Sequence, residues 1–238
     1  MIESPPPTKE KKPSSTVLPT IQIANNHPLI TTTMFSELIT CSPLAEHRID
    51  ELSEIVSSPY DPPPIGKDDR HQGVDFAYYN RGERATIEGE GVQAIMAGRV
   101  AVKLNDQNPY GNMVMIETPW DYVPAETRED LMIDEGESVY HLYGHLQNLP
   151  VLSNALVECG AHLGFVGDTG YNIAMAHLHL ETRIGPSGAD FEEMRFYDTR
   201  ASEAERENYA LWRMSGLYRH FDPMLLFEIP ATNPGDGD

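Results

Sequence analysis

The chain has 238 residues, which is enough for one well-buried core with decorations and too few to favour two full domains. Its 37 acidic and 17 basic residues give a formal net charge of -20, which repels nucleic-acid phosphates, so we expect no nucleic-acid partner. Because no apolar run approaches the roughly 18 residues of a membrane-spanning helix, we also expect no membrane-spanning segment.

The first third of the chain predicts little regular structure. Residues 1–33 are rich in Pro, Ser, Thr and Lys, which predicts a flexible tail that tethers the rest of the chain. Because the start of the tail lacks the apolar stretch of a secretion signal, we expect the protein either to stay in the cytoplasm or to have an export signal upstream of the given start. Residues 34–69 contain a helix candidate at 44–56 followed by turn-rich text, and we predict that they wrap the core without building it.

Residues 70–232 are predicted to form one mainly β domain. Short β-like runs broken by Gly, Asn and Asp predict an antiparallel core. Acidic insertions interrupt it at 118–137, a predicted long loop, and at 185–219, which contains a small helix. Both insertions are predicted to shape a rim. The strands are expected at 98–104, 112–117, 138–146 and 176–184.

The chain contains two cysteines, Cys41 and Cys159. They are expected to form one disulfide if the protein is exported and to be buried thiols if it is not. Since neither lies in a CxxC motif or near the histidine-rich motifs, we do not expect them to bind metal.

The run AHLHLET places His177 and His179 two residues apart in a predicted strand, so both imidazoles project from the same face. Taken alone, this pair is either functional or structural, because ordinary hydrogen bonds can satisfy buried histidines.

A second polar motif, DRHQGVDFAYY, places His71 and Asp75 on either side of a glycine. A bend there brings the two side chains together. Catalytic zinc sites use three imidazole or carboxylate ligands and leave one position for water. His71, Asp75 and one histidine of the HxH pair supply that set.

A third motif, SVYHLYGHL, is predicted to be a strand whose alternation places His141, Tyr143 and His145 on one side, adding titratable groups to the cleft. A histidine beside a zinc-bound water can take its proton or donate to an oxyanion. Three motifs that suit one chemistry are more specific than any one of them.

With these motifs in this order, the chain resembles the lysostaphin-type (LytM-like) zinc endopeptidases, which cleave peptides of bacterial peptidoglycan. The resemblance runs from HQGVDFA through YGNMVMI, YHLYGHLQ and AHLHLET to FDPMLLF, over about 120 residues. It implies the compact antiparallel β core of that family, a barrel-sandwich hybrid, and one Zn2+ per chain held by His71, Asp75 and His179. It also implies a catalytic pair, His145 and His177, and a location outside the cell or in its envelope.

The chain departs from the family pattern in places that bear on the shape of the cleft. His141 stands where a small polar residue is more common, Met175 and Ala176 replace Gly followed by Pro or a small residue, and Leu180 replaces Phe. The scissile bond, in a cross-link or a stem peptide, stays open at this point. The alternative function is a non-catalytic zinc-binding regulator of other wall hydrolases, although such relatives typically lack motif residues. The remaining histidines are expected to be surface or packing residues: His27, His47, His162 and His220.

Overall fold

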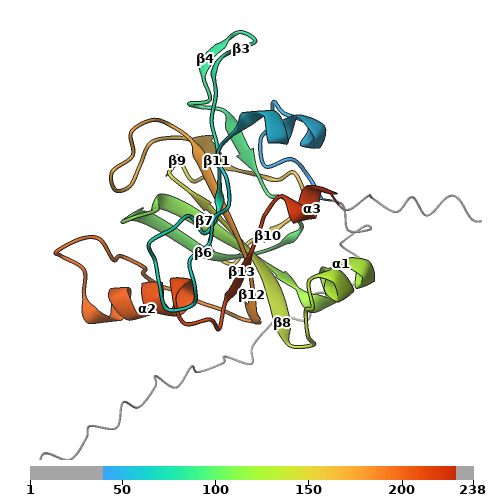
Figure 1. Cartoon of the computed structure of the whole chain (residues 1–238), viewed down its shortest axis with the longest axis vertical. Helices are drawn as coiled ribbons and strands as arrows, with labels where there is room; N and C mark the ends of the chain where they lie inside the picture. The colour runs from blue at the N-terminus through green and yellow to red at the C-terminus, as the bar shows by residue number, and fades with distance from the viewer. Residues whose placement is uncertain (1–39, 229–238) are drawn as a thin grey trace, which may run out of the picture.

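The computed structural model describes residues 40–228 (Figure 1). The predicted tail at 1–33, the first residues of the segment at 34–69, the last residues of the domain predicted at 70–232, and His27 lie outside this range. Within it the chain is mainly β and all strand pairs are antiparallel, which confirms the predicted fold class. No helix in the described range is long and apolar enough to cross a membrane.

The larger sheet has eight strands and carries the site described below. Its order is β1-β2-β12-β8-β7-β6-β10, and β13 also pairs with β12. The strands predicted at 98–104, 112–117 and 176–184 are β6, β7 and β12, whereas the run at 138–146 is β8 with a break before β9. The bounds are β1 Val56–Ser58, β2 Val74–Phe76, β6 Gly98–Gln107, β7 Gly111–Pro119, β8 Glu137–Gly144, β10 Leu156–Val157, β12 Leu178–Pro186 and β13 Arg219–Phe221.

Two smaller sheets complete the β structure. One has the order β5-β11-β9, with β5 Gly91–Gln93, β11 His162–Val166 and β9 Leu146–Gln147. The other is the hairpin of β3 Tyr79–Arg81 and β4 Arg84–Thr86, which projects from the body of the molecule at the top of Figure 1.

The helices are short, and two segments differ from the prediction. The candidate at 44–56 is a 3-10 helix, η1 Ile49–Ile55, and the predicted long loop at 118–137 contains η2 Trp120–Tyr122 and α1 Ala125–Asp130. The helix predicted in the second insertion is α2, Glu203–Arg213. Its first turn is stabilised by a capping box, in which the Ser202 hydroxyl accepts from the backbone N–H of Glu205. A last helix, α3, spans Leu225–Glu228.

The central strands are buried on both faces. Val139 and Tyr143 of β8 pack in one apolar cluster, whereas Tyr140 and Leu142 pack in a second one. Alternate residues of a strand point to opposite faces, so the two clusters lie on either side of the larger sheet. Trp212 belongs to the second cluster, so the insertion covers this face of the sheet in addition to shaping a rim.

The described part of the segment at 34–69 builds part of the core, contrary to the prediction. β1 joins the edge of the larger sheet beside β2, and Leu44 and Leu52 are fully buried in the first cluster. Cys41 and Cys159 form a disulfide with Cα atoms 5.7 Å apart, which decides between the two states predicted for them. The disulfide ties the start of the described chain to the turn between β10 and β11.

Candidate metal centre

Three side chains from two motifs meet at the edge of the larger sheet. Asp75 lies on β2, and the register of β2 and β12 places it directly opposite His179. His71 precedes β2, and the predicted bend between it and Asp75 lies at Gly73. A Cβ at Gly73 would lie 2.5 Å from the carbonyl oxygen of Leu180 and 2.9 Å from the ring of His179. Glycine therefore lets β2 approach β12 closely enough for the three side chains to meet.

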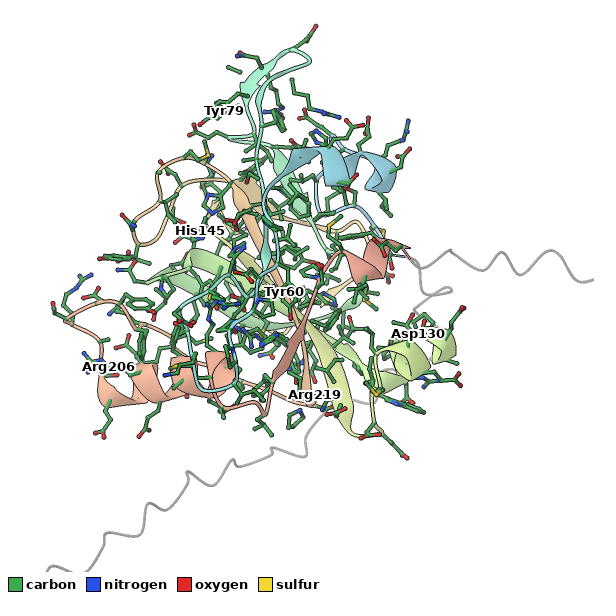
Figure 2. The ribbon with its side chains drawn as sticks, in the orientation of Figure 1. Tyr60, Tyr79, Asp130, His145, Arg206 and Arg219 are labelled. Atoms are coloured by element: carbon green, nitrogen blue, oxygen red, sulfur yellow. A yellow bond between two sulfur atoms is a disulfide. The ribbon has the colours of Figure 1, made fainter. Side chains whose placement is uncertain are left out.

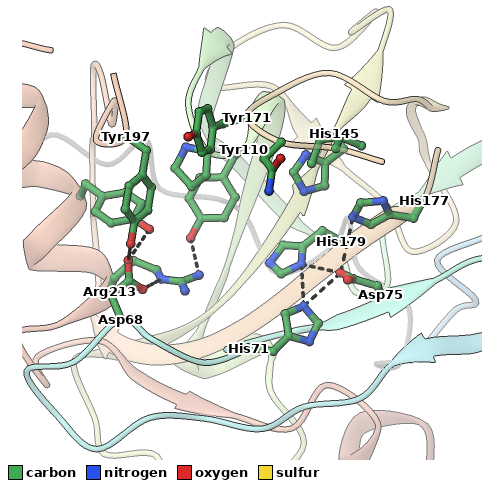
Figure 3. A pocket seen from close by; sticks show the side chains of 14 residues that line it. Asp68, His71, Asp75, Tyr110, His145, Tyr171, His177, His179, Tyr197 and Arg213 are labelled. Carbon is green, nitrogen blue, oxygen red and sulfur yellow. Dashed lines mark hydrogen bonds and ion pairs between the residues drawn. The ribbon is translucent and has the colours of Figure 1, made fainter. Parts of the chain in front are cut away.

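The ligand atoms of these side chains converge on one point (Figure 3). His71 Nε2 lies 3.1 Å from Asp75 Oδ1 and 3.2 Å from His179 Nδ1, and His179 Nδ1 lies 2.7 Å from Asp75 Oδ1. Ligands about 2.0–2.2 Å from a tetrahedral zinc are about 3.3–3.6 Å apart. The two distances from His71 fit this spacing within a few tenths of an ångström. The distance between His179 and Asp75 needs to lengthen by about half an ångström.

Hydrogen bonds outside the cluster fix the tautomers of both imidazoles. His71 Nδ1 lies 2.9 Å from the carbonyl oxygen of Pro59, and His179 Nε2 lies 3.1 Å from a carboxylate oxygen of Glu181. Since carbonyl and carboxylate oxygens only accept, both of these nitrogens carry the proton in the neutral rings. His71 Nε2, His179 Nδ1 and Asp75 Oδ1 then point lone pairs at one another. A proton on His179 or a metal cation between the three atoms relieves this repulsion, and a carboxylate with two imidazoles is a ligand set that suits zinc.

Two further histidines stand beside this cluster. The rings of His145 and His177 have centroids 4.6 Å apart, and His177 Nε2 lies 3.8 Å from Asp75 Oδ1. His145 Nδ1 donates to the carbonyl oxygen of Thr169 at 2.8 Å, and His177 Nδ1 donates to that of Met175 at 2.9 Å. In both neutral rings the Nε2 atom is therefore unprotonated, which leaves it able to accept a proton.

His145 lines the cleft, but strand alternation does not explain its position there. His141 and Tyr143 are fully buried and lie outside the cleft: the Tyr143 hydroxyl accepts from the backbone N–H of Ile95, and His141 contacts Thr118. The prediction that the three side chains share one side is therefore wrong. His145 follows the end of β8 with φ +62, and this left-handed residue breaks the alternation and turns the imidazole to the cleft.

The charges of the cluster follow from its burial and its hydrogen bonds. Burial opposes ionisation of Asp75, but hydrogen bonds from His179 and His71 outweigh it and lower the pKa of the carboxyl. Burial likewise lowers the pKa of His179, but hydrogen bonds to Asp75 and Glu181 raise it to about 9. Burial lowers the pKa of His145 to about 3, helped by the neighbouring His179 and His177. At neutral pH and without a metal, His179 therefore carries a proton that it donates to the anionic Asp75, whereas His145 is neutral.

Glu181 is a functional neighbour that the sequence reasoning missed. Its side chain is fully buried and accepts from His179, so it orients the ring of a candidate metal ligand. The signal was present in AHLHLET, because Glu181 lies two residues after His179 and so points to the same face of the strand.

The cluster opens to a cleft whose far wall comes from the second insertion (Figure 3). Tyr197, Tyr209 and Arg213 line it there, so the second insertion shapes a rim as predicted, whereas no residue of the insertion at 118–137 lines the cleft. Tyr171 stands across the mouth with its ring stacked on that of Tyr197, at 6.2 Å between centroids and 17° between planes. The other described histidines, His47, His162 and His220, do not line the cleft.

Comparisons with known proteins return solved structures only. No family model matches the chain, and no curated protein is similar to it. The chain is similar to a zinc-containing peptidase from Vibrio cholerae, at 24% identity over 54% of this chain and 33% of that one, with a TM-score of 0.38. It is also similar to the catalytic domain of lysostaphin from Staphylococcus simulans, at 25% identity over 58% and 87% of the two chains, with a TM-score of 0.40.

A third similar structure is a variant of the catalytic domain of the prophage-encoded protein EnpA from Enterococcus faecalis, at 22% identity over 58% and 87% of the chains, with a TM-score of 0.40. The alignment thus spans a third of the Vibrio cholerae peptidase and most of the two catalytic domains.

Proposed function

We propose that the protein is a zinc-dependent endopeptidase that hydrolyses peptide bonds in peptidoglycan, in its cross-links or its stem peptides. One observation carries the proposal: three lone-pair atoms of His71, Asp75 and His179 converge within 3.2 Å, and the unprotonated nitrogens of His145 and His177 stand beside them. The resemblance of the motifs to lysostaphin-type endopeptidases supplies the substrate class.

His71, Asp75 and His179 would hold the zinc, which, when bound, supplies a Lewis acid that polarises the scissile carbonyl and activates water. His145 and His177 then carry the proton steps. Their neutral Nε2 atoms can accept the proton that water loses, and the protonated rings can donate to the oxyanion of the tetrahedral intermediate. The carbonyl oxygens of Thr169 and Met175 hold these rings in the tautomer that the first step requires.

The disulfide supports a location outside the cytoplasm. Disulfides persist in oxidising compartments and are rare in the cytosol, so the Cys41–Cys159 bond suits a protein of the cell envelope or the extracellular space. Peptidoglycan, the proposed substrate, lies in that compartment.

The alternative is a zinc-binding regulator of other wall hydrolases that does not itself cleave. The presence of both His145 and His177 in the cleft favours the enzyme, because a regulator that only binds zinc needs neither.

The test is to measure zinc per chain in the purified protein together with the release of new amino groups from purified peptidoglycan. About one zinc per chain and release that stops with a chelator or in His179→Ala support the enzyme. Zinc without release from several wall types points to the regulator, and absence of zinc binding overturns the proposal.

A further inference from the structure

The carboxylate of Glu181 is the hub of a buried network behind the metal-ligand ring. Its Oε1 accepts from His179 Nε2 and from the Tyr110 hydroxyl at 2.7 Å, and it also pairs with Arg213. Its Oε2 accepts from Arg183 at 2.9 Å and from Trp212 Nε1 at 3.1 Å. A buried carboxylate requires such partners, since an unpaired charge in the interior is strongly destabilising.

Two of these donors come from one helix, outside the strands that carry the histidine motifs. Trp212 and Arg213 are the last residues of α2, in the insertion that interrupts the β core. They reach Glu181 from the face of the sheet that α2 covers, 31 and 32 residues further along the chain.

Arg213 is itself held in place from a second direction. Its Nε donates to Asp68 Oδ1 at 2.7 Å, and Asp68 Oδ2 accepts from the hydroxyls of Tyr209 at 2.7 Å and Tyr197 at 2.9 Å. Asp68 precedes the metal-binding motif by only a few residues. The end of α2 therefore bridges the segment before His71 to the carboxylate behind His179. Figure 3 shows Arg213 and Asp68 on the side of the cleft away from His145 and His177.

We infer that Trp212 and Arg213 are positioning residues that set the affinity of the site for its metal, by fixing Glu181 against the ring of His179. The inference rests on the proposed metal site. It gives the insertion at 185–219 a second role, which is to support metal binding. Partners of a metal-ligand histidine typically change metal affinity 10–100-fold when they are removed. Without Arg213 the Oε1 atom loses its charged partner and keeps only the Tyr110 hydroxyl beside the ring, so the orientation and tautomer of His179 are less firmly fixed.

The experiment is to measure the zinc dissociation constant of the full chain by competition with a chromophoric chelator. The variants are Arg213→Gln, Arg213→Lys and Trp212→Phe. The matched control is Arg206→Gln, which removes the same charge from the exposed outer part of the same helix (Figure 2). The melting temperature of each zinc-free protein is measured in parallel, so that a loss of folding is separated from a loss of metal affinity.

We expect Arg213→Gln to weaken zinc binding about tenfold or more and Trp212→Phe to weaken it less, because Oε2 keeps its bonds from Arg183. Arg213→Lys should recover part of the affinity, and Arg206→Gln should bind as the wild type does. If Arg213→Gln does not fold, the zinc affinity of Trp212→Phe tests the inference in its place. Folded variants that bind zinc within twofold of the wild type overturn the inference and leave the proposed function standing, whereas a wild type that binds no zinc overturns both.

Discussion

His145 and His177 face each other across the mouth of the metal centre, with ring centroids 4.6 Å apart, and each ring is anchored through Nδ1 to a backbone carbonyl. Neither ring belongs to the three-atom cluster that suits zinc. This separation between atoms that bind metal and atoms that move protons can be tested one residue at a time.

Replacing His145 or His177 by alanine should abolish most cleavage while the protein keeps its zinc. General acid–base groups contribute about 10²–10⁴-fold to rate, so release of amino groups from peptidoglycan should fall by that order. Zinc content, measured on the same samples, is the control. A His145→Ala protein that cleaves at the wild-type rate contradicts the assigned role.

Replacing His71 or Asp75 by alanine should instead empty the site. Each removes one of three ligand atoms, and catalytic zinc sites rarely survive on two protein ligands. We expect less than one tenth of the wild-type zinc per chain after dialysis, no cleavage, and a circular dichroism spectrum like that of the zinc-free wild type. Full zinc occupancy in Asp75→Ala would show that the carboxylate is not a ligand.

The convergence of His71, Asp75 and His179 could be predicted from the sequence because these residues lie in short motifs whose local geometry is simple. Asp75 and His179 sit on strands that pair directly, and Gly73 marks the bend that brings His71 to them. The mainly β fold was predictable for the same reason, since turn residues delimit most of the strands.

The rest of the site depends on contacts that no local pattern encodes. His145 was assigned to the cleft, but the strand alternation offered for it fails at φ +62. The bond from Arg213 to Asp68 joins residues 145 positions apart and exists only because α2 packs on the sheet. Glu181 lies within the AHLHLET motif, yet its role depends on the same packing of α2 on the sheet.

His141 should make stability depend on pH. It is fully buried, its Nδ1 atom lacks a partner among the described residues, and burial lowers its pKa to about 3. Between that value and the unfolded value of about 6.5, the unfolded chain binds the proton and the folded protein does not, so stability falls as the pH falls.

The check on His141 is urea unfolding of the zinc-free protein at pH 7 and pH 5. The loss of unfolding free energy between the two should be about 2 kcal/mol smaller in His141→Leu than in the wild type. At pH 7 the leucine variant should be close to wild type, since it removes a poorly satisfied polar group. Equal losses in both proteins would mean that the folded protein protonates His141 readily.

Breaking the bond between Cys41 and Cys159 should lower stability and spare the site. The bond closes a loop across a sequence separation of 118 residues, and constraining a loop of that size in the unfolded chain is worth about 2–5 kcal/mol. We expect a double Cys→Ser variant to show that loss in urea unfolding, and the oxidised wild type to show the same loss on adding reductant.

The double variant also distinguishes the unfolded-state effect from damage to the metal centre. Cys41 hydrogen-bonds through its backbone N–H to Ile95, and neither cysteine lines the cleft, so zinc affinity and cleavage at a temperature where the variant is folded should match the wild type. An unchanged free energy of unfolding would mean that the loop is already constrained without the bond. A loss of zinc would mean that the cysteine-linked segment supports the site, which the described contacts do not show.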